Sequence, residues 1–199
     1  MQSFQLDTIP GELTWLRPPV DQHVDEQGLM IKAGALTDWF IDPAGKVNAS
    51  NAPVALFTPP AGDFVLQARV AVDFGATYDA GVIFIYGDDS HWAKVCFEYS
   101  PQNEPMVVSV VTRDSSDDCN SVVIDGHEVY LRISRNGPAW AFHYSRDGRT
   151  WRMVRYFKVH AAETRIGFSA QSPTGDVCEA RFTEIAWRPG GVADIRSGV

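Results

Sequence analysis

The sequence predicts an all-β protein, a two-sheet antiparallel β-sandwich of jelly-roll type. Short segments rich in Val, Ile, Phe, Trp and Tyr recur along its 199 residues and are separated by turn signals. Several of them alternate apolar and polar residues with period two, as strands with one buried face do. No segment carries the longer apolar period of an extended helix. Ten or more short strands joined by tight turns are typical of such sandwiches.

The predicted strands follow one another between turns. In chain order they span residues 29–33, 63–72, 80–86, 91–100, 106–113, 128–135, 139–145, 150–157, 165–171 and 178–187. The dipeptides Asn136-Gly137 and Asp147-Gly148 are hairpin signals, because both tolerate the positive φ of tight turns. We expect one domain over residues 1–190, followed by a surface tail over residues 191–199 that lacks strand character.

Composition and charge narrow the classes of partner. With 45% hydrophobic and 21% charged residues, the chain can bury a sizeable core. Its formal net charge of -8 argues against a nucleic-acid backbone or an anionic membrane surface as the main partner, because both repel acidic surfaces. The phosphate-binding glycine loop and the motif G-x-G-x-x-G do not occur, and no cofactor is predicted.

Three features favour a cytoplasmic location. The first residues, MQSFQLDTIPGEL, lack the basic and apolar regions of a signal peptide. No apolar run approaches the length needed to span a bilayer. Cys96, Cys119 and Cys178 are odd in number and form no C-x-x-C pair, which fits reduced thiols better than a disulfide framework.

The segment HWAKVCFEYS, residues 91–100, carries the most informative pattern. One face is apolar: Ala93, Val95, Phe97 and Tyr99. The other places Trp92, Lys94 and Glu98 on what the pattern predicts to be a solvent face. One interpretation is a salt bridge with an indole packed over it, which stabilises a sheet by up to about 1 kcal/mol per pair. The other is an aromatic platform for a sugar, flanked by charges that fix its orientation.

Further walls of such a platform are expected from Asp38-Trp39, Tyr78-Asp79 and Arg113. The predicted ligand-binding residues are therefore Trp39, Tyr78, Asp79, Trp92, Lys94, Glu98 and Arg113. In this hypothesis the aromatic rings stack on a pyranose ring, and the charged groups hydrogen-bond its hydroxyls. The predicted ligand is a saccharide.

No catalytic signature stands out. The motifs G-x-S-x-G and H-E-x-x-H are absent, and no strand repeats acids at the E-x-D-x-E spacing of sandwich-type glucanases. Glu98 is a lone strand carboxylate, whereas a retaining glycosidase needs a second one about 5 Å away. The alternative hypothesis is a glycan-active hydrolase or lyase, with Glu98 as general acid or base and an Asp of residues 114–118 as its partner.

The stretch RDSSDDCNS, residues 113–121, is predicted to be an acidic loop. Asp114, Asp117 and Asp118 offer the oxygen ligands that calcium favours. Their spacing does not match the D-x-[DN]-x-[DN]-G loop, so a solvated or ion-paired loop is preferred over a metal site. A third interpretation is that these aspartates rim a groove and accept hydrogen bonds from sugar hydroxyls.

Several segments match a known family in order and spacing. They are TDWFIDP (37–43), YDAGVIFIYGDDSHWAKVCFEYS (78–100), SVVTRDSSDD (109–118), LRISRNGPAWAFHYSRDGRTWRMVRYF (131–157) and IGFSAQSPTG (166–175). The chain resembles the concanavalin A-like family of largely uncharacterised proteins that includes the fungal regulation-of-enolase protein and bacterial YesU-like proteins. It also resembles the concanavalin A-like module of some β-xylosidases.

This resemblance extends over about residues 29–187. It implies a jelly roll whose concave face is suspected of binding carbohydrate, with no established reaction. It also implies that Trp92, Lys94 and Glu98 belong to a shared ligand site, with Phe40 as a second aromatic beside Trp39. The name of the fungal relatives adds a third hypothesis, a regulatory module that binds another protein through an exposed sheet.

Overall fold

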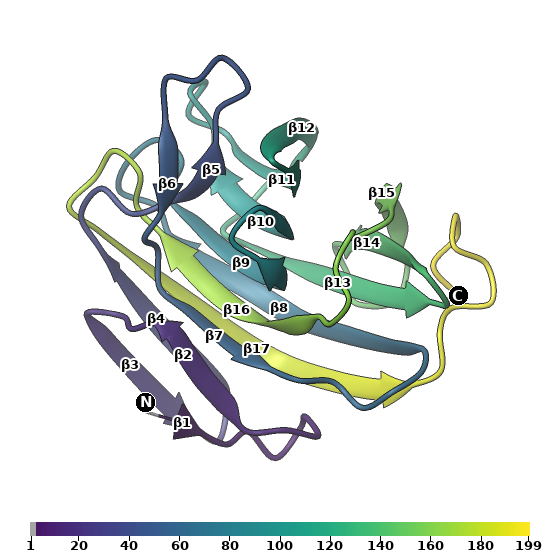
Figure 1. Cartoon of the computed structure of the whole chain (residues 1–199). Coiled ribbons are helices and arrows are strands. Elements are labelled where there is room, and N and C mark those ends of the chain that lie inside the picture. The colour runs from purple at the N-terminus through teal and green to yellow at the C-terminus, as the bar shows by residue number, and fades with distance from the viewer. Residues whose placement is uncertain (1–2) are drawn as a thin grey trace.

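The computed structural model describes residues 3–199, so the predicted domain of residues 1–190 is described from residue 3 onward (Figure 1). Its strands are β1 (Ser3–Phe4), β2 (Leu13–Arg17), β3 (Asp21–Asp25), β4 (Gly28–Gly34), β5 (Trp39–Ile41), β6 (Asn48–Ser50), β7 (Val54–Phe57), β8 (Phe64–Asp73), β9 (Ala80–Asp88), β10 (His91–Tyr99), β11 (Pro105–Arg113), β12 (Ser115–Val123), β13 (Glu128–Asn136), β14 (Ala139–Ser145), β15 (Arg152–Phe157), β16 (Arg165–Gln171) and β17 (Val177–Pro189). Within the described residues, no helix has the length and apolarity to cross a membrane.

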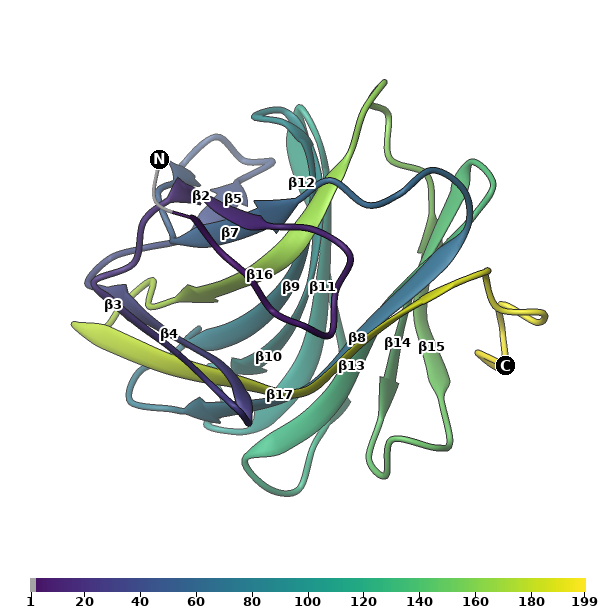
Figure 2. The same ribbon diagram turned by 90° about the horizontal axis from the view of Figure 1, so that it is seen from below.

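Two antiparallel sheets pack face to face. The front sheet has eight strands in the order β1-β2-β7-β16-β9-β10-β11-β12, and the back sheet has seven in the order β15-β14-β13-β8-β17-β4-β3. Figure 2 looks between these layers, with β16, β9 and β11 on one side and β17, β8 and β13 on the other. Apolar residues of both sheets form the main core, which includes Phe97, Phe168 and Phe182. The predicted jelly-roll sandwich is confirmed.

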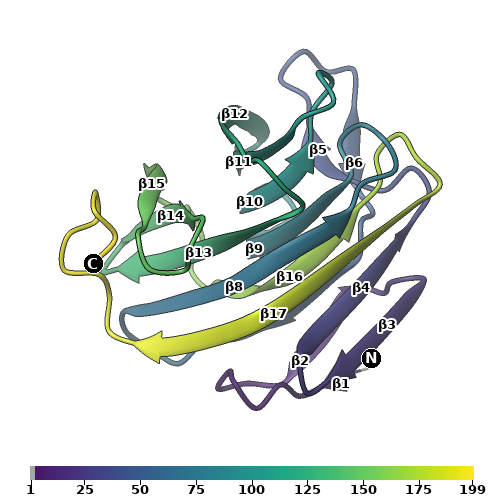
Figure 3. The same ribbon diagram turned by 180° about the vertical axis from the view of Figure 1, so that it is seen from behind.

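The front sheet is covered on its outer face as well. The hairpin β5–β6 lies against it, beside β10 and β12 (Figure 1 and Figure 3). Trp39 of this hairpin packs edge-on against Phe84 and Trp92, with ring centroids 5.2 and 5.8 Å apart. These rings belong to a second hydrophobic cluster, distinct from the main core. Because β9 and β10 are covered on both sides, most of their residues are buried.

The prediction that Trp92 and Lys94 lie on a solvent face was wrong. The period of two is confirmed, since Ala93, Val95 and Phe97 belong to the main core and Trp92 lies on the opposite side. That side is buried because the hairpin covers it, and Trp92 is only 1% exposed. Cys96 is buried beside it, and burial raises the pKa of its thiol well above the usual range, so it stays protonated.

The prediction of an acidic loop after Arg113 was also wrong, because Ser115–Val123 form the edge strand β12. Main-chain pairing with β11 over most of its length holds this polar segment in the sheet. Charged side chains suit an edge strand, because they discourage pairing with a further chain. The register places Asp118 opposite Val110, and Val110 is in turn opposite Lys94.

Residues 191–199 form turns after β17 and fold back onto the outer face of the back sheet near β13 and β14 (Figure 1). Val192 is buried there, and the side chains of Arg132, Asn136 and His143 hydrogen-bond to the main chain of this segment. The segment contains no strand, and it is attached to the sandwich at several points along its length.

Candidate functional site

A pocket of about 580 Å³ lies on the outer face of the front sheet, beside the hairpin β5–β6. Strands β10, β11 and β12 supply its floor: Lys94, Glu98, Met106, Val110, Asp118 and Asn120. The hairpin and the loops around β9, β10 and β16 supply its walls, which include Asp38, Phe40, Val47, Tyr78, Pro101 and Gln171. Apolar walls around a few polar groups are typical of small-molecule sites.

Lys94 is the cation at the bottom of the pocket. Its Nζ lies 3.1 Å from Oδ1 of Asp38 and donates a hydrogen bond of 2.8 Å to Oε1 of Gln171. Burial is the largest single effect and lowers the pKa of Lys94, but the acidic groups around it, Asp38 first among them, together outweigh burial, and the net pKa is raised. Lys94 is therefore a charged ammonium with two protein acceptors, Asp38 and Gln171, for its three N–H donors.

Glu98 lies four residues after Lys94, on the same face of β10. Burial is the main cause that raises the pKa of its carboxyl to about 8, and Lys94 opposes this shift. Asp118 and Asp38 add to it, because a second and third negative charge nearby disfavour ionisation. Glu98 is consequently protonated in most molecules at neutral pH and is able to donate a hydrogen bond.

Asp118 reaches the same pocket from the edge strand β12. The pKa of Asp118 is also raised, with desolvation as the first cause, while Lys94 and Arg155 act in the opposite direction. Because both carboxyls line one pocket and each is influenced by Lys94, the fold brings together the pair that the sequence spacing did not reveal.

Tyr78 forms an exposed aromatic rim. It is 40% exposed and adopts a φ of 71°, a left-handed conformation that side chains other than glycine rarely take. Its amide donates to the carbonyl of Tyr99 at 2.7 Å, and its carbonyl accepts from Nε2 of Gln171 at 3.3 Å. Gln171 therefore connects the ion pair on the floor to the main chain of the rim.

Six residues that the sequence analysis named for the site meet in this pocket: Asp38, Phe40, Tyr78, Lys94, Glu98 and Asp118. Trp39 and Trp92 do not line it, because both are buried in the second hydrophobic cluster. Their predicted role as stacking surfaces does not fit this burial, and we assign them a packing role beside the pocket.

Asp79 and Arg113 lie outside the pocket. Asp79 is buried, and its carboxylate accepts hydrogen bonds from the amides of Gly75 and Ala76 and from Oγ of Ser172. It thereby fixes the loop that presents Tyr78. Arg113 is exposed at the end of β11, where it pairs in register with His91 and Ser115.

The three aspartates considered as calcium ligands lie in three different environments. Asp118 lines the pocket, Asp117 pairs with Nη2 of Arg155 at 3.1 Å, and Asp114 occupies the turn before β12 with a φ of 63°. Among residues 3–199, no three His, Cys, Asp or Glu side chains gather closely enough to hold a metal ion. The ion-paired interpretation fits Asp117, and the groove interpretation fits Asp118.

Three polar lining residues were not predicted from the sequence: Gln171, Asn120 and Thr174. The available signal was an amide side chain at the end of the apolar strand β16; in the structure Gln171 is buried, which is uncommon for this residue type. Asn120 carries no such signal, because its segment was expected to be a loop.

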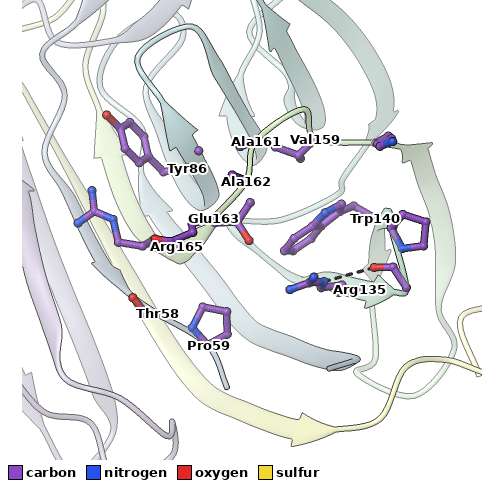
Figure 4. Close-up of a pocket in the computed structure, with 15 residues that line it drawn as sticks. Thr58, Pro59, Tyr86, Arg135, Trp140, Val159, Ala161, Ala162, Glu163 and Arg165 are labelled. Atoms are coloured by element: carbon purple, nitrogen blue, oxygen red, sulfur yellow. Dashed lines mark hydrogen bonds between the residues drawn. The ribbon is translucent and has the colours of Figure 1, made fainter. Parts of the chain in front are cut away.

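A second cavity of about 560 Å³ lies between the ends of β9 and β13 and the loop before β16 (Figure 4). Arg135 stands near Trp140 there, with its Cζ 5.7 Å from the ring centroid, and Nε donates to the carbonyl of Gly137. Arg165 is directed away from Trp140, toward Tyr86 (Figure 4). None of the sequence-predicted site residues lines this cavity.

Residues 15–190 match the model of a protein family described as "Protein of unknown function (DUF1349)". The chain belongs to this family. No curated protein matches the chain. Membership in the family fixes no activity, and the narrower resemblance to regulation-of-enolase and YesU-like proteins stays a prediction.

Solved structures support the fold of this family member. A functionally unknown protein from Saccharomyces cerevisiae is similar with a TM-score of 0.80 and 23% identity, over 89% of this chain and 96% of that one. A mutant of the GH43 protein BlXynB from Bacillus licheniformis has a TM-score of 0.70 and 15% identity, over 90% of this chain and 37% of that one. An alginate lyase from Klebsiella pneumoniae has a TM-score of 0.55 and 14% identity, over 85% and 84%. At these identities the likeness shows a shared sandwich fold.

Proposed function

We propose that the protein binds a carbohydrate in the pocket between the hairpin β5–β6 and strands β10–β12. The observation that carries this proposal is the placement of an exposed ring, Tyr78, at the rim above a floor with Glu98 and Asp118. A pyranose needs both kinds of surface, because its C–H groups pack on an aromatic ring and its hydroxyls require donors and acceptors.

The polar groups of the floor supply both hydrogen-bonding roles. Protonated Glu98 donates, the ionised form of Asp118 accepts, and the amide of Asn120 does both. Lys94 contributes mainly indirectly, since Asp38 and Gln171 already accept from its ammonium. A neutral sugar therefore fits better than an anionic one, because even with Glu98 protonated the lining carries two further carboxyl groups, those of Asp38 and Asp118, against one ammonium.

The structural neighbours are consistent with this class of ligand. They include an engineered GH43 glycoside hydrolase that displays endo-xylanase activity and an alginate lyase, both named for carbohydrate chemistry. This chain corresponds to only 38% of that hydrolase, so the likeness supports a sugar-binding sandwich and carries no catalytic residue across. A cytoplasmic location and the lack of nucleic-acid or membrane partners remain part of the proposal.

A glycan array tests the proposal, followed by titration calorimetry with the glycan that binds best. Tyr78→Ala is expected to weaken binding at least tenfold, because the stacking surface is lost. The matched control is Tyr156→Ala, which removes a tyrosine that is 58% exposed on β15 of the other sheet. Equal affinity of Tyr78→Ala and Tyr156→Ala, or no bound glycan on the array, would contradict the proposal.

A second candidate function is a glycan-active hydrolase or lyase. The observation that favours it is the protonated Glu98 in one pocket with Asp118, since a general acid must hold its proton at working pH. Glu98 would protonate the leaving oxygen of the glycosidic bond. Asp118 would take a proton from the attacking water in a hydrolase, or from a carbon of the sugar ring in a lyase. Turnover of an oligosaccharide that disappears in Glu98→Gln supports this function, whereas binding without turnover leaves the non-catalytic function.

A further inference from the structure

Residues 192–198, which we call the C-terminal clasp, are held by side chains of the back sheet through main-chain atoms. The carbonyl of Val192 accepts from Nδ2 of Asn136 at 2.8 Å, and the carbonyl of Ile195 pairs with Nε2 of His143 at 2.7 Å. The carbonyl of Gly198 accepts from Nη1 of Arg132 at 2.7 Å. The three carbonyls are spaced three residues apart, so these contacts recognise a backbone shape rather than particular side chains.

Arg132 has the surroundings of a binding residue. Its guanidinium carbon lies 3.4 Å from the ring centroid of Trp151, and Gln67 accepts from its Nε and Nη2. It is buried, yet no carboxylate pairs with it anywhere in residues 3–199. A buried guanidinium without an acid depends on neutral acceptors, and here the clasp supplies one of them.

His143 makes the contact sensitive to protonation. A carbonyl only accepts, so Nε2 carries the hydrogen in the bond to Ile195, and Nδ1 has no partner among the described residues although it is buried. Burial lowers the pKa of His143, the bond to Ile195 opposes this, and Arg132 adds to the lowering. A proton on Nδ1 would have no acceptor and would face the charge of Arg132.

The other groups around His143 do not offset that charge. Strand β15 places Met153 opposite it, and Arg188 of β17 adds positive charge near Arg132. On the clasp, Asp194 and Arg196 are both exposed. Asp194 accepts from the amide of Arg196, within the clasp itself.

Gly198 fixes the fit of the clasp. It has a φ of 75°, and a Cβ there would lie 2.8 Å from Cβ of Trp151 and 3.0 Å from Cδ2 of His143. The clasp can therefore approach the sheet only with glycine at this position.

We propose that the outer face of the back sheet at Arg132, Asn136, His143 and Trp151 is a peptide-docking site. It is filled by the chain's own clasp, accepts the same segment from a second copy of this chain when its own is displaced, and is emptied by acid. In the intact protein the chain's own clasp occupies the site in preference to that of a second copy, because tethering makes its effective concentration far higher.

The sign of the pH effect follows from the neutral state of bound His143. Well above pH 6.5, the ordinary pKa of histidine, His143 is neutral whether the site is filled or empty, and docking is at full strength. As the pH falls below 6.5 the empty site takes up a proton, and docking weakens.

The test uses the full chain with Gly198→Leu, which displaces the clasp, and a synthetic peptide of residues 190–199, GGVADIRSGV. The peptide should bind Gly198→Leu but not Gly45→Leu, a matched control with a φ of 73° and no neighbour within 4 Å. Its affinity should fall about tenfold from pH 7.5 to pH 5.5. A peptide carrying leucine in place of its own Gly198 should not bind.

Amide relaxation of residues 192–198 checks the displacement separately. A clasp that stays seated in Gly198→Leu, or a loose clasp with no peptide binding, overturns the proposal. Should Gly198→Leu not fold, the unsubstituted protein decides. Its clasp should loosen as the pH falls below 6.5 and should stay seated in His143→Gln, whose amide still donates to Ile195. Equal behaviour of these two proteins overturns the role of His143.

Discussion

Lys94 of β10 and Asp38, 56 positions earlier in the chain, form an ion pair beneath the pocket with Nζ 3.1 Å from Oδ1. The Lys94 side chain is 3% exposed and that of Asp38 is 20% exposed. Since Asp38 directly precedes the hairpin β5–β6, this pair fastens one wall of the pocket to its floor. Gln171 extends the connection to the rim at Tyr78.

Replacing Lys94 with Met should lower the free energy of unfolding by about 3 kcal/mol. Met retains the apolar stem, but Asp38 loses its partner, and removing one member of a buried pair is strongly destabilising. Removing one member of a buried pair costs about 3–5 kcal/mol, and the cost here lies at the lower end because Asp38 keeps some contact with water. Urea denaturation at pH 7 measures it. The exposed Lys46→Met is the control, with an expected change below about 0.5 kcal/mol.

The carboxyl of Glu98 should make stability fall as pH rises. Its pKa is about 8 in the folded protein against 4.5 for the free group, so the folded state holds a proton that the unfolded state releases between these values. Stability is therefore full below pH 4.5 and decreases up to pH 8. Relative to Glu98→Gln, the unsubstituted protein should lose on the order of 2 kcal/mol across this window. Parallel pH profiles of the two proteins would contradict the raised pKa.

Truncating Trp92 should mainly lower the stability of the fold, whereas truncating Tyr78 should mainly weaken sugar binding. Trp92→Ala removes a buried ring from the second cluster and should cost about 3–5 kcal/mol of unfolding free energy. Tyr78→Ala removes an exposed ring and should cost less than about 1 kcal/mol of unfolding free energy, while sugar binding weakens at least tenfold. Chemical denaturation separates the two effects. A small cost for Trp92→Ala would mean that its ring is not part of a core.

The strands that the sequence predicted have one of two patterns. Either apolar and polar residues alternate along the strand, or the strand is a long apolar run. Residues 128–136 alternate in this way, and Val129, Leu131 and Ile133 do lie in the main core. The glycines of the two predicted hairpins have φ values of 58° and 70°, as those turns require.

What the sequence could not predict depends on contacts between distant segments. Residues 115–123 have weak strand propensity and become β12 only because β11 offers main-chain partners. The hairpin of residues 39–50 is short and pairs only with itself, yet it converts the outer face of β10 from a solvent surface into a core. For the same reason Trp92 could be assigned to the correct face of its strand but not to the correct environment.

The sequence predicted only the part of the site whose residue types themselves suggest a chemical role. Tyr78, Lys94, Glu98 and Asp118 carry chemistry that is visible in the sequence, and strand register brings them to one pocket. Asn120 and Gln171 contribute only through their positions in the folded sheet, which spacing alone does not reveal.

Amide chemical-shift mapping with the best glycan from the array tests the central claim most directly. We expect the largest shifts at Tyr78 and at the side-chain amides of Asn120 and Gln171, with none at Trp140 in the second cavity. Shifts that cluster around Trp140 and Glu163, or a spectrum that no glycan changes, would contradict a carbohydrate site in the pocket beside the hairpin.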